Sequence, residues 1–481
     1  MGKVPAGLIE EYLGRLARFG WHLGLDRIEA LLAGLGHPER AFPAVQVAGT
    51  NGKGSTAAML ASILAAAGCR TGLYTSPHLE SYRERLAILE ERSSKRAGRP
   101  ARICRRLVAG RRLASVLGRV MAVADEVARG PAGAPTEFEV LTATAAQWFA
   151  EEQVDVAVLE VGLGGRLDAT TAVPALLAVL THIDLDHTDR LGSTLAAIAA
   201  EKAAIIRPGR PVVVAPQAGE AWAVIARQAA GQGSPVFAVS EGREGAEPRS
   251  EGAAAASVAV ARYAVEGVTW RHTTFTYFPA AGPPLEGLRT ALLGRHQATN
   301  AAVALAAALA LRREGFATTE EAIRRGLASA RWPGRLEVLR RRPLVVVDGA
   351  HNPDGMRRLV EAWKELSPGR RPLVVCGFLR DRPVAEMVAA LAGLAGEVIV
   401  TRPASDRAAE PVEVAGLFAS HGVDATVEGD PTAAACLALA RPSVKAGAPV
   451  LGCGTLYLVG ALRRAWRPKA RASTGEGSDT P

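Results

Sequence analysis

The chain has few cysteines, few aromatic residues and no long hydrophobic run. Its 481 residues include five cysteines and no CxxC pair, which argues against a disulfide framework or structural zinc and favours a reducing cytoplasm. No apolar run reaches the roughly 20 residues that a membrane span needs. The N-terminal stretch carries acidic residues within its apolar part and lacks the layout of a signal peptide. We therefore expect a cytoplasmic protein without a membrane partner.

The excess positive charge is confined to one segment. The net charge is +9, and residues 91–112 hold nine Arg or Lys residues against a single acid, Glu91. A solvated basic loop is the simplest interpretation, and contact with an acidic substrate or a nucleic acid is the alternative. A nucleic-acid-binding ATPase would need basic charge spread over its surface and aromatic stacking positions, but aromatic residues make up only 5% of the chain. We expect no nucleic-acid partner.

Short apolar strands alternate with helical segments over the first part of the chain. Strands are predicted at AFPAVQVAG, RTGLYTS, VDVAVLEVG, ALLAVLTHI and RPVVVAP. A helix follows the Gly-rich turn TNGKGST, and another starts at the capping box formed by Thr136 and Glu139. VAVARYAV and VTWRHTTFTYF alternate as antiparallel strands do, and residues 230–257 are predicted to be a low-complexity loop. This order predicts an α/β fold with a mostly parallel sheet.

The α/β pattern restarts in the last third of the chain. Strands are predicted at LVVVDGAH, RPLVVCGF, GEVIVT, DATVE and APVLGCG, with helices between them. We place the domain boundary near residue 293, which gives an N-terminal domain of residues 1–293 and a C-terminal domain of residues 294–466. The tail, residues 467–481, is predicted to be disordered.

The first motif with a chemical meaning is AGTNGKGST, residues 48–56. It follows an apolar strand and opens a helix, which is the setting of a phosphate-binding loop. Its glycines allow a phosphate to approach the backbone, and Lys53 supplies a positive charge. The spacing departs from a strict Walker A motif because Gly54 separates Lys53 from Ser55. A plain glycine turn is the alternative.

Two further motifs follow strands of the same predicted sheet. Glu160 ends the apolar strand that opens LEVGLGGRLDATT, where a carboxylate needs a partner or a metal. Magnesium binding is our interpretation, and a capping or ion-paired acid is the alternative. In THIDLDHTDRLGSTLAAIAAEKAAII, His187 follows a strand end together with Asp184 and Asp186, and Lys202 lies in an apolar helix where a charged amine is costly. The spacing predicts a functional edge of the sheet.

A fourth group of motifs lies in the second domain. Asp348 follows an apolar strand, as Glu160 does, and His351 and Asn352 come just before a helix. HQATN contains Asn300, and RWPGRLE places Arg335 in a Pro-Gly turn. Taken alone, each is explained by ordinary turn chemistry.

Together and in this order, the motifs resemble those of the Mur ligase superfamily, and specifically the folylpolyglutamate synthase/dihydrofolate synthase family. GTNGKGS, TSPHL, LEVGLGGRLDAT, DHTDRLGSTLAAIAAEKA, PGRLE and DGAHNP each resemble a family signature, over roughly residues 20–460. The resemblance implies an N-terminal P-loop ATPase-like domain, a C-terminal Rossmann-like domain, and ATP with magnesium between them. It implies an ATP-dependent ligase that joins L-glutamate to a pterin carboxylate, dihydropteroate or a tetrahydrofolate polyglutamate, through an acyl phosphate.

The resemblance also assigns roles to residues of this sequence. It implies that ATP is bound by Thr50, Asn51, Gly52, Lys53, Gly54, Ser55, Asn300, Arg335 and Asp348. Two magnesium ions would be held by Ser76, Glu160, His187 and Lys202, the last as a carbamate, and the catalytic residues would be Lys53, Lys202 and His351. The pterin would lie near Trp21, His22, Leu23, Thr136, Glu137, Phe138, Glu139, Leu167, Asp168 and Ala169.

The sequence departs from the family pattern in three places. Thr171 stands where the family usually has Asn, EKAAI replaces EKAGI, and the basic segment 91–112 replaces a short strand and turn. The nearest alternative function is another Mur-type amide ligase, acting on a muropeptide or on a cyanophycin-like substrate, and a catalytically inactive homologue is a further one. We expect a monomer whose partners are small-molecule substrates.

Overall fold

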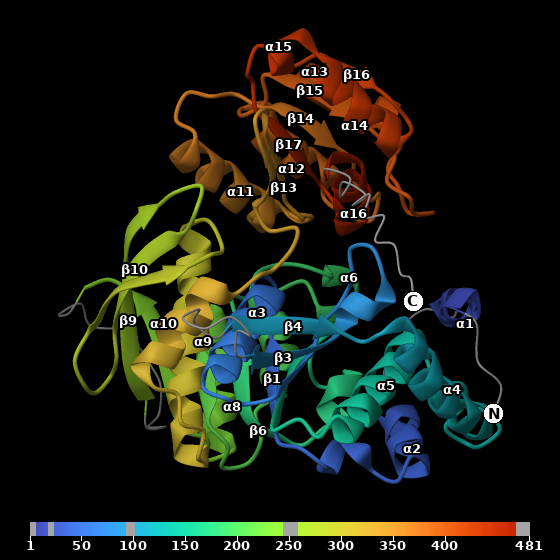
Figure 1. Ribbon diagram of the computed structural model, residues 1–481, viewed down its shortest axis with the longest axis vertical. Helices are drawn as coiled ribbons and strands as arrows, with labels where there is room; N and C mark the ends of the chain where they lie inside the picture. Colours follow the sequence, from blue (N-terminus) through green and yellow to red (C-terminus); the bar gives the residue numbers. More distant parts are fainter. Residues whose placement is uncertain (1–5, 18–23, 93–101, 244–257, 468–481) are drawn as a thin grey trace, which may run out of the picture. The chain divides into compact units, whose positions relative to one another are not determined.

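The computed structural model describes residues 6–17, 24–92, 102–243 and 258–467. It divides the chain into two compact units, Met1–Pro333 (unit 1) and Gly334–Pro481 (unit 2). Both units are α/β, as the alternation of strands and helices predicts (Figure 1).

Unit 1 is built on an 11-stranded sheet. The strand order is β11-β10-β9-β8-β7-β6-β1-β5-β2-β3-β4; the strands from β9 to β2 run parallel, and antiparallel strands lie at both edges. The strands are β1 (Ala44–Ala48), β2 (Thr71–Tyr74), β3 (Leu86–Arg92), β4 (Arg102–Leu107), β5 (Val156–Glu160), β6 (Ala175–Leu180), β7 (Val212–Val214), β8 (Val236–Glu241), β9 (Val258–Val268), β10 (Thr273–Phe278) and β11 (Leu285–Thr290).

Helices cover both faces of this sheet. The α-helices of unit 1 are α1 (Ala6–Ala17), α2 (Asp26–Gly34), α3 (Lys53–Ala66), α4 (Gly110–Val127), α5 (Glu137–Glu151), α6 (Thr188–Leu191), α7 (Leu195–Ala203), α8 (Gly219–Gly231), α9 (Arg295–Leu311) and α10 (Glu320–Ser329). Short 3₁₀ helices are η1 (Pro38–Arg40), η2 (Tyr82–Arg85), η3 (Ala169–Ala172) and η4 (Arg312–Glu314). The capping box predicted for α5 is confirmed, because the Thr136 and Glu139 side chains each bond to the other's backbone N–H.

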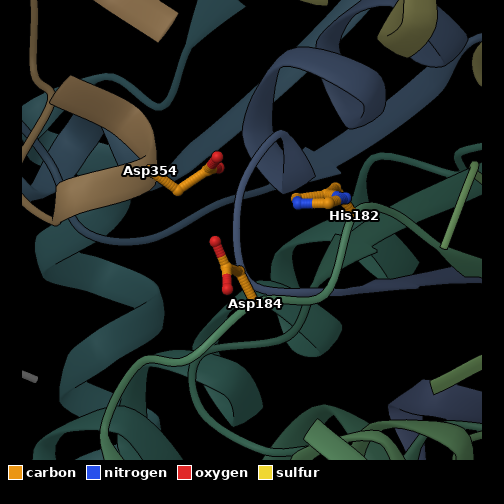
Figure 2. Close-up of side chains that lie close together, drawn as sticks. All are labelled: His182, Asp184 and Asp354. Carbon is orange, nitrogen blue, oxygen red and sulfur yellow. The ribbon is translucent and has the colours of Figure 1, made fainter. Parts of the chain in front are cut away.

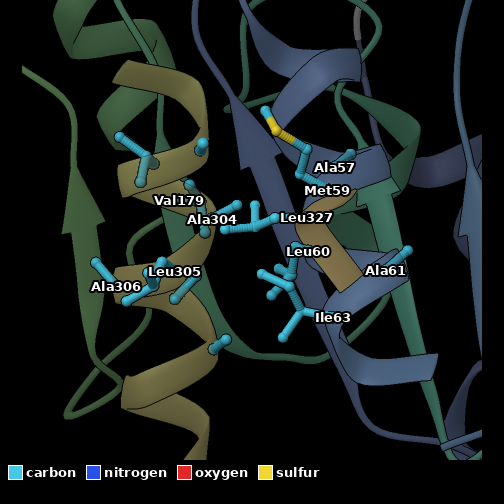
Figure 3. Packing of buried hydrophobic residues seen from close by; sticks show 14 of the residues in the cluster. Ala57, Met59, Leu60, Ala61, Ile63, Val179, Ala304, Leu305, Ala306 and Leu327 are labelled. Atoms are coloured by element: carbon cyan, nitrogen blue, oxygen red, sulfur yellow. The ribbon is translucent and has the colours of Figure 1, made fainter. Parts of the chain in front are cut away.

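The central strands are buried on both faces, which explains their continuous apolar sequences. In β1, Val45 and Val47 belong to the core cluster formed with α3, α9 and α10, whereas Ala44 and Ala48 belong to clusters on the opposite face. Figure 3 shows the first of these clusters, with side chains of α3 and α9 meeting Leu327 of α10. The Gly-rich turn between β1 and α3 is therefore set in a rigid frame.

The division into units falls later in the chain than the boundary expected near residue 293. Helices α9 and α10 follow residue 293, but both contribute buried residues to the α3 side of unit 1. Ser62 Oγ of α3 donates to the Gly326 carbonyl of α10 at 2.7 Å. Sequence patterns could not show this, because α9 is apolar all round and would suit the core of either domain.

The contact between α10 and α3 gives a stability prediction. A Cβ at Gly326 would lie 2.5 Å from the Ile63 Cα, so Gly326→Ala should destabilise unit 1 by about 1–3 kcal/mol. Gly14→Ala in α1 is the matched control: a Cβ there meets nothing within 4 Å, and we expect a gain of about 0.5–1 kcal/mol. Urea unfolding of both variants would measure the difference, and equal effects would contradict the close contact.

Unit 2 has a six-stranded sheet in the order β12-β13-β17-β14-β15-β16, parallel except for β12. Its strands are β12 (Glu337–Arg341), β13 (Leu344–Val347), β14 (Leu373–Cys376), β15 (Glu397–Val400), β16 (Ala425–Val427) and β17 (Val450–Cys453). Its helices are α11 (Pro353–Leu366), α12 (Val384–Ala392), α13 (Pro411–Ser420), α14 (Pro431–Ala440), α15 (Pro442–Lys445) and α16 (Leu456–Trp466). This arrangement confirms the expected fold class.

Two local expectations were wrong, those for the loop 230–257 and for the basic segment. The predicted loop 230–257 contains β8, which pairs in parallel with β7 and β9. The antiparallel pairing expected for VAVARYAV and VTWRHTTFTYF is confirmed, because β10 pairs antiparallel with β9 across a turn in which Thr269 N donates to His272 O. The basic segment is not one loop: within it β3 ends, β4 pairs with β3, and α4 begins. Residues 93–101 and the predicted tail 468–481 lie outside the described residues.

Among the described residues, no helix is long and apolar enough to cross a membrane. All five cysteines are free thiols.

Candidate functional site

The Gly-rich loop lies between the end of β1 and the start of α3, as predicted. Lys53 is the first residue of α3, and its Nζ turns back to donate to the Gly49 and Thr50 carbonyls at 3.2 and 3.1 Å. Gly52 precedes the helix with a φ of 90°, a left-handed conformation that favours glycine. A first helical turn presents backbone N–H groups and a positive dipole end to an anion. The loop has the form of a phosphate cradle.

Close packing explains why this loop needs glycine. A Cβ at Gly49 would lie 1.9 Å from the Thr181 Oγ1, and one at Gly52 would lie 2.4 Å from the Asn300 Oδ1. Asn300 comes from α9 and donates to the Gln297 Oε1 at 3.1 Å. The structure therefore places Asn300, predicted to contact the nucleotide, directly against the loop.

The segment after β6 is fastened to the same loop. Thr50 Oγ1 donates to the Asp184 carbonyl at 2.9 Å, and Thr50 N donates to the His182 carbonyl at 2.8 Å. Figure 2 shows the His182 and Asp184 side chains on this segment. The Asp354 carboxylate in the same figure belongs to unit 2, where it pairs with Arg358 at 2.8 Å in the first turn of α11.

Glu160 is a buried carboxylate at the carboxyl end of β5. Its side chain is 5% exposed, and its Oε2 accepts the Ser76 N–H at 3.1 Å. Ser76 follows β2, the strand next to β5, and begins the SPHL segment. The two predicted metal ligands are thus neighbours, one hydrogen bond apart.

Lys202 is a buried amine at the end of α7. It is 4% exposed, and its Nζ donates to the Gly49 carbonyl at 3.0 Å, the carbonyl that Lys53 also contacts. Burial and, to a lesser extent, the nearby Lys53 charge lower the pKa of Lys202 to about 7, although Asp186 and Asp168 act in the opposite direction. Near neutral pH a large share of this amine is uncharged, which makes it a nucleophile.

His187 lies between β6 and α7 and immediately precedes α6. Its backbone is left-handed, with a φ of 51°, and its N–H donates to the Asp186 Oδ1 at 2.9 Å. A non-glycine residue in this conformation is uncommon and marks a constrained position. Through residues 182–184, the segment that carries His187 is tied to the loop at Thr50.

The Gly-rich stretch after Glu160 is organised by Asp168. The Asp168 carboxylate accepts N–H groups from Gly162, Leu163 and Thr170, each at 3.0 Å. Burial raises the pKa of Asp168, and these hydrogen bonds oppose the shift. The Asp168 carboxylate oxygens already accept hydrogen bonds from the loop, so Asp168 would affect a substrate by fixing the shape of the loop.

Thr171, the departure from the family's Asn, is part of the same support. Its Oγ1 donates to the Gly165 carbonyl at 2.7 Å and accepts from Gln46 Nε2 at 2.7 Å. Gln46 is fully buried within the apolar strand β1. We did not single out Gln46 from the sequence, although one amide inside AVQVA was a signal.

The described residues predicted to lie near a pterin form two groups, residues 136–139 at the start of α5 and residues 167–169 after β5. Glu139 pairs with Arg27 at 3.1 Å, and Glu137 pairs with Arg85 at 3.3 Å. Phe138 packs against the Gly-rich stretch, since a Cβ at Gly162 would lie 2.7 Å from its ring. The side chain of Leu167 is partly exposed, whereas Thr136 and Ala169 are buried. Trp21, His22 and Leu23 lie outside the described residues.

The SPHL segment carries a half-buried histidine beside Arg85. Arg85 Nε donates to the His78 Nδ1 at 3.0 Å, and the His78 ring lies 4.4 Å from that of Tyr82. Burial and the Arg85 charge lower the pKa of His78 to about 3, so this imidazole is neutral at physiological pH and accepts the guanidinium hydrogen bond.

In unit 2, Asp348 organises the turn that contains Arg335 and the start of the AHNP loop. Its carboxylate accepts the Leu336 and Ala350 N–H groups at 2.8 Å each. Burial raises the pKa of Asp348, and the Arg335 charge opposes that shift. Arg335 lies against Gly349, where a Cβ would be 2.3 Å from its Nη1, and His351 Nδ1 is 2.8 Å from the Gly349 carbonyl. These three predicted residues share one loop cluster.

Within each unit, contacts bring several of the predicted residues together. In unit 1 the Gly49 carbonyl joins Lys53 and Lys202, and the Glu160–Ser76 pair lies at the ends of β5, which is next to β1, and of β2, which is next to β5. Sequence reasoning did not identify this shared carbonyl, because a backbone atom leaves no signature in residue type. Such a group of a phosphate cradle, a buried carboxylate and a reactive amine fits the handling of a nucleotide and metal.

Comparisons with known proteins agree with this geometry. The Mur ligase middle domain matches residues 111–308, and the Mur ligase glutamate ligase domain matches residues 334–456. The dihydrofolate synthase/folylpolyglutamate synthase of Bacillus subtilis is 37% identical over 388 residues, 79% of this chain and 81% of that protein. The folylpolyglutamate synthase of Lacticaseibacillus casei is 34% identical and covers 94% of this chain and 95% of its own.

Solved structures extend the likeness over both units. The Escherichia coli FolC structure in complex with DHPP and ADP has a TM-score of 0.77 and 31% identity, covering 96% of this chain and 97% of its own. The folylpolyglutamate synthase of Mycobacterium tuberculosis with ADP and AMPPCP has a TM-score of 0.81 and 29% identity, covering 96% of this chain and 98% of its own. The resemblance inferred from the motifs is confirmed: the chain belongs to the folylpolyglutamate synthase/dihydrofolate synthase family of Mur ligases, which are ATP-dependent acid–amino-acid ligases.

Proposed function

We propose that this chain joins L-glutamate to the carboxylate of a pterin, either dihydropteroate or a tetrahydrofolate polyglutamate, with hydrolysis of ATP to ADP and phosphate. The substrate carboxylate oxygen takes the γ-phosphoryl group and forms an acyl phosphate. The glutamate amine then attacks the acyl carbon, loses a proton and expels phosphate to leave an amide. The observation that carries this proposal is the meeting of Lys53 and Lys202 on the Gly49 carbonyl, next to the strand ends that carry Glu160 and Ser76.

The loop formed by Thr50, Asn51, Gly52, Lys53, Gly54 and Ser55 is proposed to bind the ATP phosphates. The N-terminal turn of α3 offers backbone N–H groups, and Lys53 Nζ, held by two carbonyls, offers a fixed positive charge. Fixed donors of this kind stabilise the charge that spreads over the γ-phosphoryl group during transfer. Asn300, Arg335 and Asp348 are the proposed further nucleotide contacts.

The residues present fit a magnesium site. Ser76, Glu160 and His187 offer hydroxyl, carboxylate and imidazole ligands, and the Glu160 charge is buried, a cost that a cation would offset. Magnesium, when bound, would offset the negative charge on the phosphates and the substrate carboxylate. Glu160 would then hold the magnesium ion in place, while the Ser76 N–H orients the Glu160 carboxylate.

Lys202 is proposed to carry a carbamate. An uncharged amine adds CO₂ to give N-carboxylysine and one proton, and the pKa of about 7 makes the uncharged form available. The modification replaces a cation by an anion beside Lys53, so a repulsion becomes an attraction. This gives the proposed ligand set a second anionic group besides Glu160.

The pterin is proposed to lie near Thr136–Glu139 and Leu167–Ala169. Phe138 offers an aromatic face beside Gly162, and the Asp168 hydrogen bonds give the loop a fixed shape. His351, held on the Gly349 carbonyl, is proposed to act close to the reacting groups. A cytoplasmic location, a monomeric state and the lack of a nucleic-acid partner remain predictions.

Release of ADP that depends on glutamate tests the function. We expect activity with dihydropteroate, with a reduced folate monoglutamate, or with both, and none with a UDP-muropeptide. Activity confined to the muropeptide would contradict the proposed acceptor while leaving the ligase class intact. A rate of ADP release that does not depend on glutamate would contradict the amide ligation itself.

A further inference from the structure

The indole of Trp332 rests on the second residue of the P-loop helix. A Cβ at Gly54 would lie 2.4 Å from the Trp332 Cζ2 and 3.0 Å from its Nε1. Gly54 lies between Lys53 and Ser55, the residues proposed to meet the phosphates, and it is buried. The contact leaves no space for a side chain at Gly54 unless the indole moves.

The basic segment supplies the second contact of this tryptophan. Arg105 of β4 places its guanidinium carbon 5.5 Å from the centre of the Trp332 ring, within the range of a cation–π interaction. Arg105 Nη2 also donates to the Glu84 carbonyl at 3.2 Å, which ties it to η2. We refer to Arg105, Trp332 and Gly54 together as the Trp332 stack.

The chain that leads to Trp332 is fastened along α3. Arg325 of α10 donates to the Ala66 carbonyl at the end of α3 at 2.7 Å, and it pairs with Glu91 of β3. Gly326 of α10 lies against Ile63 of α3, and Leu327 enters the α3–α9 core (Figure 3). From Arg325 to Trp332 the chain therefore follows α3 from its last turn to its first.

Trp332 comes directly before Pro333, the last residue of unit 1. It is the final side chain that anchors the connecting chain to the P-loop helix before unit 2 begins at Gly334. Movement of the connecting chain would therefore act on unit 1 through a residue that contacts the start of the P-loop helix. We propose that Trp332 is a positioning residue that fixes the first turn of α3 to the connecting chain, and that Arg105 of the basic segment holds Trp332 in place.

The proposal rests on one part of the proposed function, the binding of ATP phosphates at the loop. Removal of the indole frees both the first helical turn and the connection, so the change should appear in nucleotide binding. We expect Trp332→Ala to raise the KM for ATP and the Kd for ADP by about tenfold to a hundredfold. The KM for glutamate should change less than the KM for ATP. Trp332→Phe should recover part of the loss.

Arg105 variants test the second contact. Arg105→Ala should raise the KM for ATP by about two- to fivefold, and Arg105→Lys, which keeps a cation, should recover part of this. Trp222→Phe in α8 is the matched control for loss of a tryptophan, with nucleotide binding unchanged. Urea unfolding of each variant separates a loss of positioning from a loss of stability.

A double-mutant cycle gives the sharpest test. Gly54→Ala alone should weaken ADP binding because the new Cβ displaces the indole. Trp332→Ala in the same chain removes that clash, so the double variant should lose less than the product of the two single losses. Independent losses, or a Kd for ADP in Trp332→Ala within about twofold of the wild type, would overturn the proposal. If Trp332→Ala does not fold, Trp332→Phe and Arg105→Ala carry the same test.

Calorimetry with ADP keeps the two proposals distinguishable. This measurement needs no pterin or glutamate. If the wild type binds ADP but shows no turnover on any pterin, the result would count against the proposed acceptor alone. Normal turnover combined with unchanged ADP binding in Trp332→Ala would count against the positioning role alone.

Discussion

Lys202→Ala is expected to lower kcat by at least about a hundredfold, the usual effect of removing one group that stabilises a transition state by charge. In the structure the Lys202 amine is buried and shares the Gly49 carbonyl with Lys53. Alanine removes the side chain that we propose to carry a carboxylate. Lys202→Glu places a shorter carboxylate in the same region and should keep part of the activity.

Lys202→Met separates charge from packing. Methionine fills a similar volume without a charge, so it should be as inactive as alanine while keeping the stability of the fold. If the lysine instead works as a cation, Lys202→Arg should be more active than Lys202→Glu. That order, or full activity of Lys202→Ala with ATP and magnesium, would contradict the carbamate.

The pKa of Lys202 gives this prediction a pH dependence. Since burial and Lys53 lower the pKa to about 7, the amine becomes protonated as the pH falls below 7 and then cannot add CO₂. Wild-type activity should therefore fall at acidic pH, and it should recover when the enzyme is returned to neutral pH with added bicarbonate. The activity of Lys202→Glu should respond to neither treatment. A carbamate carbon signal in the ¹³C NMR spectrum after labelling with ¹³C-bicarbonate, absent from Lys202→Met, measures the modification without reference to turnover.

The strand–turn–helix order around Lys53 and the strand end at Glu160 could be predicted from the sequence, because local patterns determine them. Continuous apolar strands predicted a covered parallel sheet, and the carboxyl ends of such strands lie at one edge. Lys202 stood out for a similar reason, as a cation within an apolar helix. Each of these signals depends on residues close together in the chain.

The features that could not be predicted depend on contacts between distant residues. The Gly49–Thr181 contact and the shared Gly49 carbonyl join segments more than 100 residues apart, and neither leaves a pattern. The boundary near residue 293 was placed too early because only the packing of α9 and α10 on α3 assigns them to unit 1. The basic segment looked like a loop because its charges hide a strand whose Arg105 faces Trp332.

Glu160→Gln is expected to lower kcat by about a hundred- to a thousandfold, or roughly 3–4 kcal/mol of transition-state stabilisation. The substitution keeps the shape of the side chain, and Gln Oε1 can still accept the Ser76 N–H, so local structure should persist. What is lost is a negative charge that is 5% exposed at the end of β5. A neutral amide is less costly to bury than a carboxylate, so the free energy of unfolding should stay equal or rise in the variant.

Glu241→Gln is the matched control because Glu241 also ends a strand of the same sheet, but its side chain is exposed. We expect it to be as active as the wild type. The magnesium titration decides the role of Glu160: if its carboxylate binds the ion, the variant should need a higher magnesium concentration for half-maximal activity and for ADP binding. A reduced kcat with an unchanged magnesium requirement would instead assign Glu160 to the support of Ser76 and the SPHL segment, and the proposed metal ligand set would lose its central member.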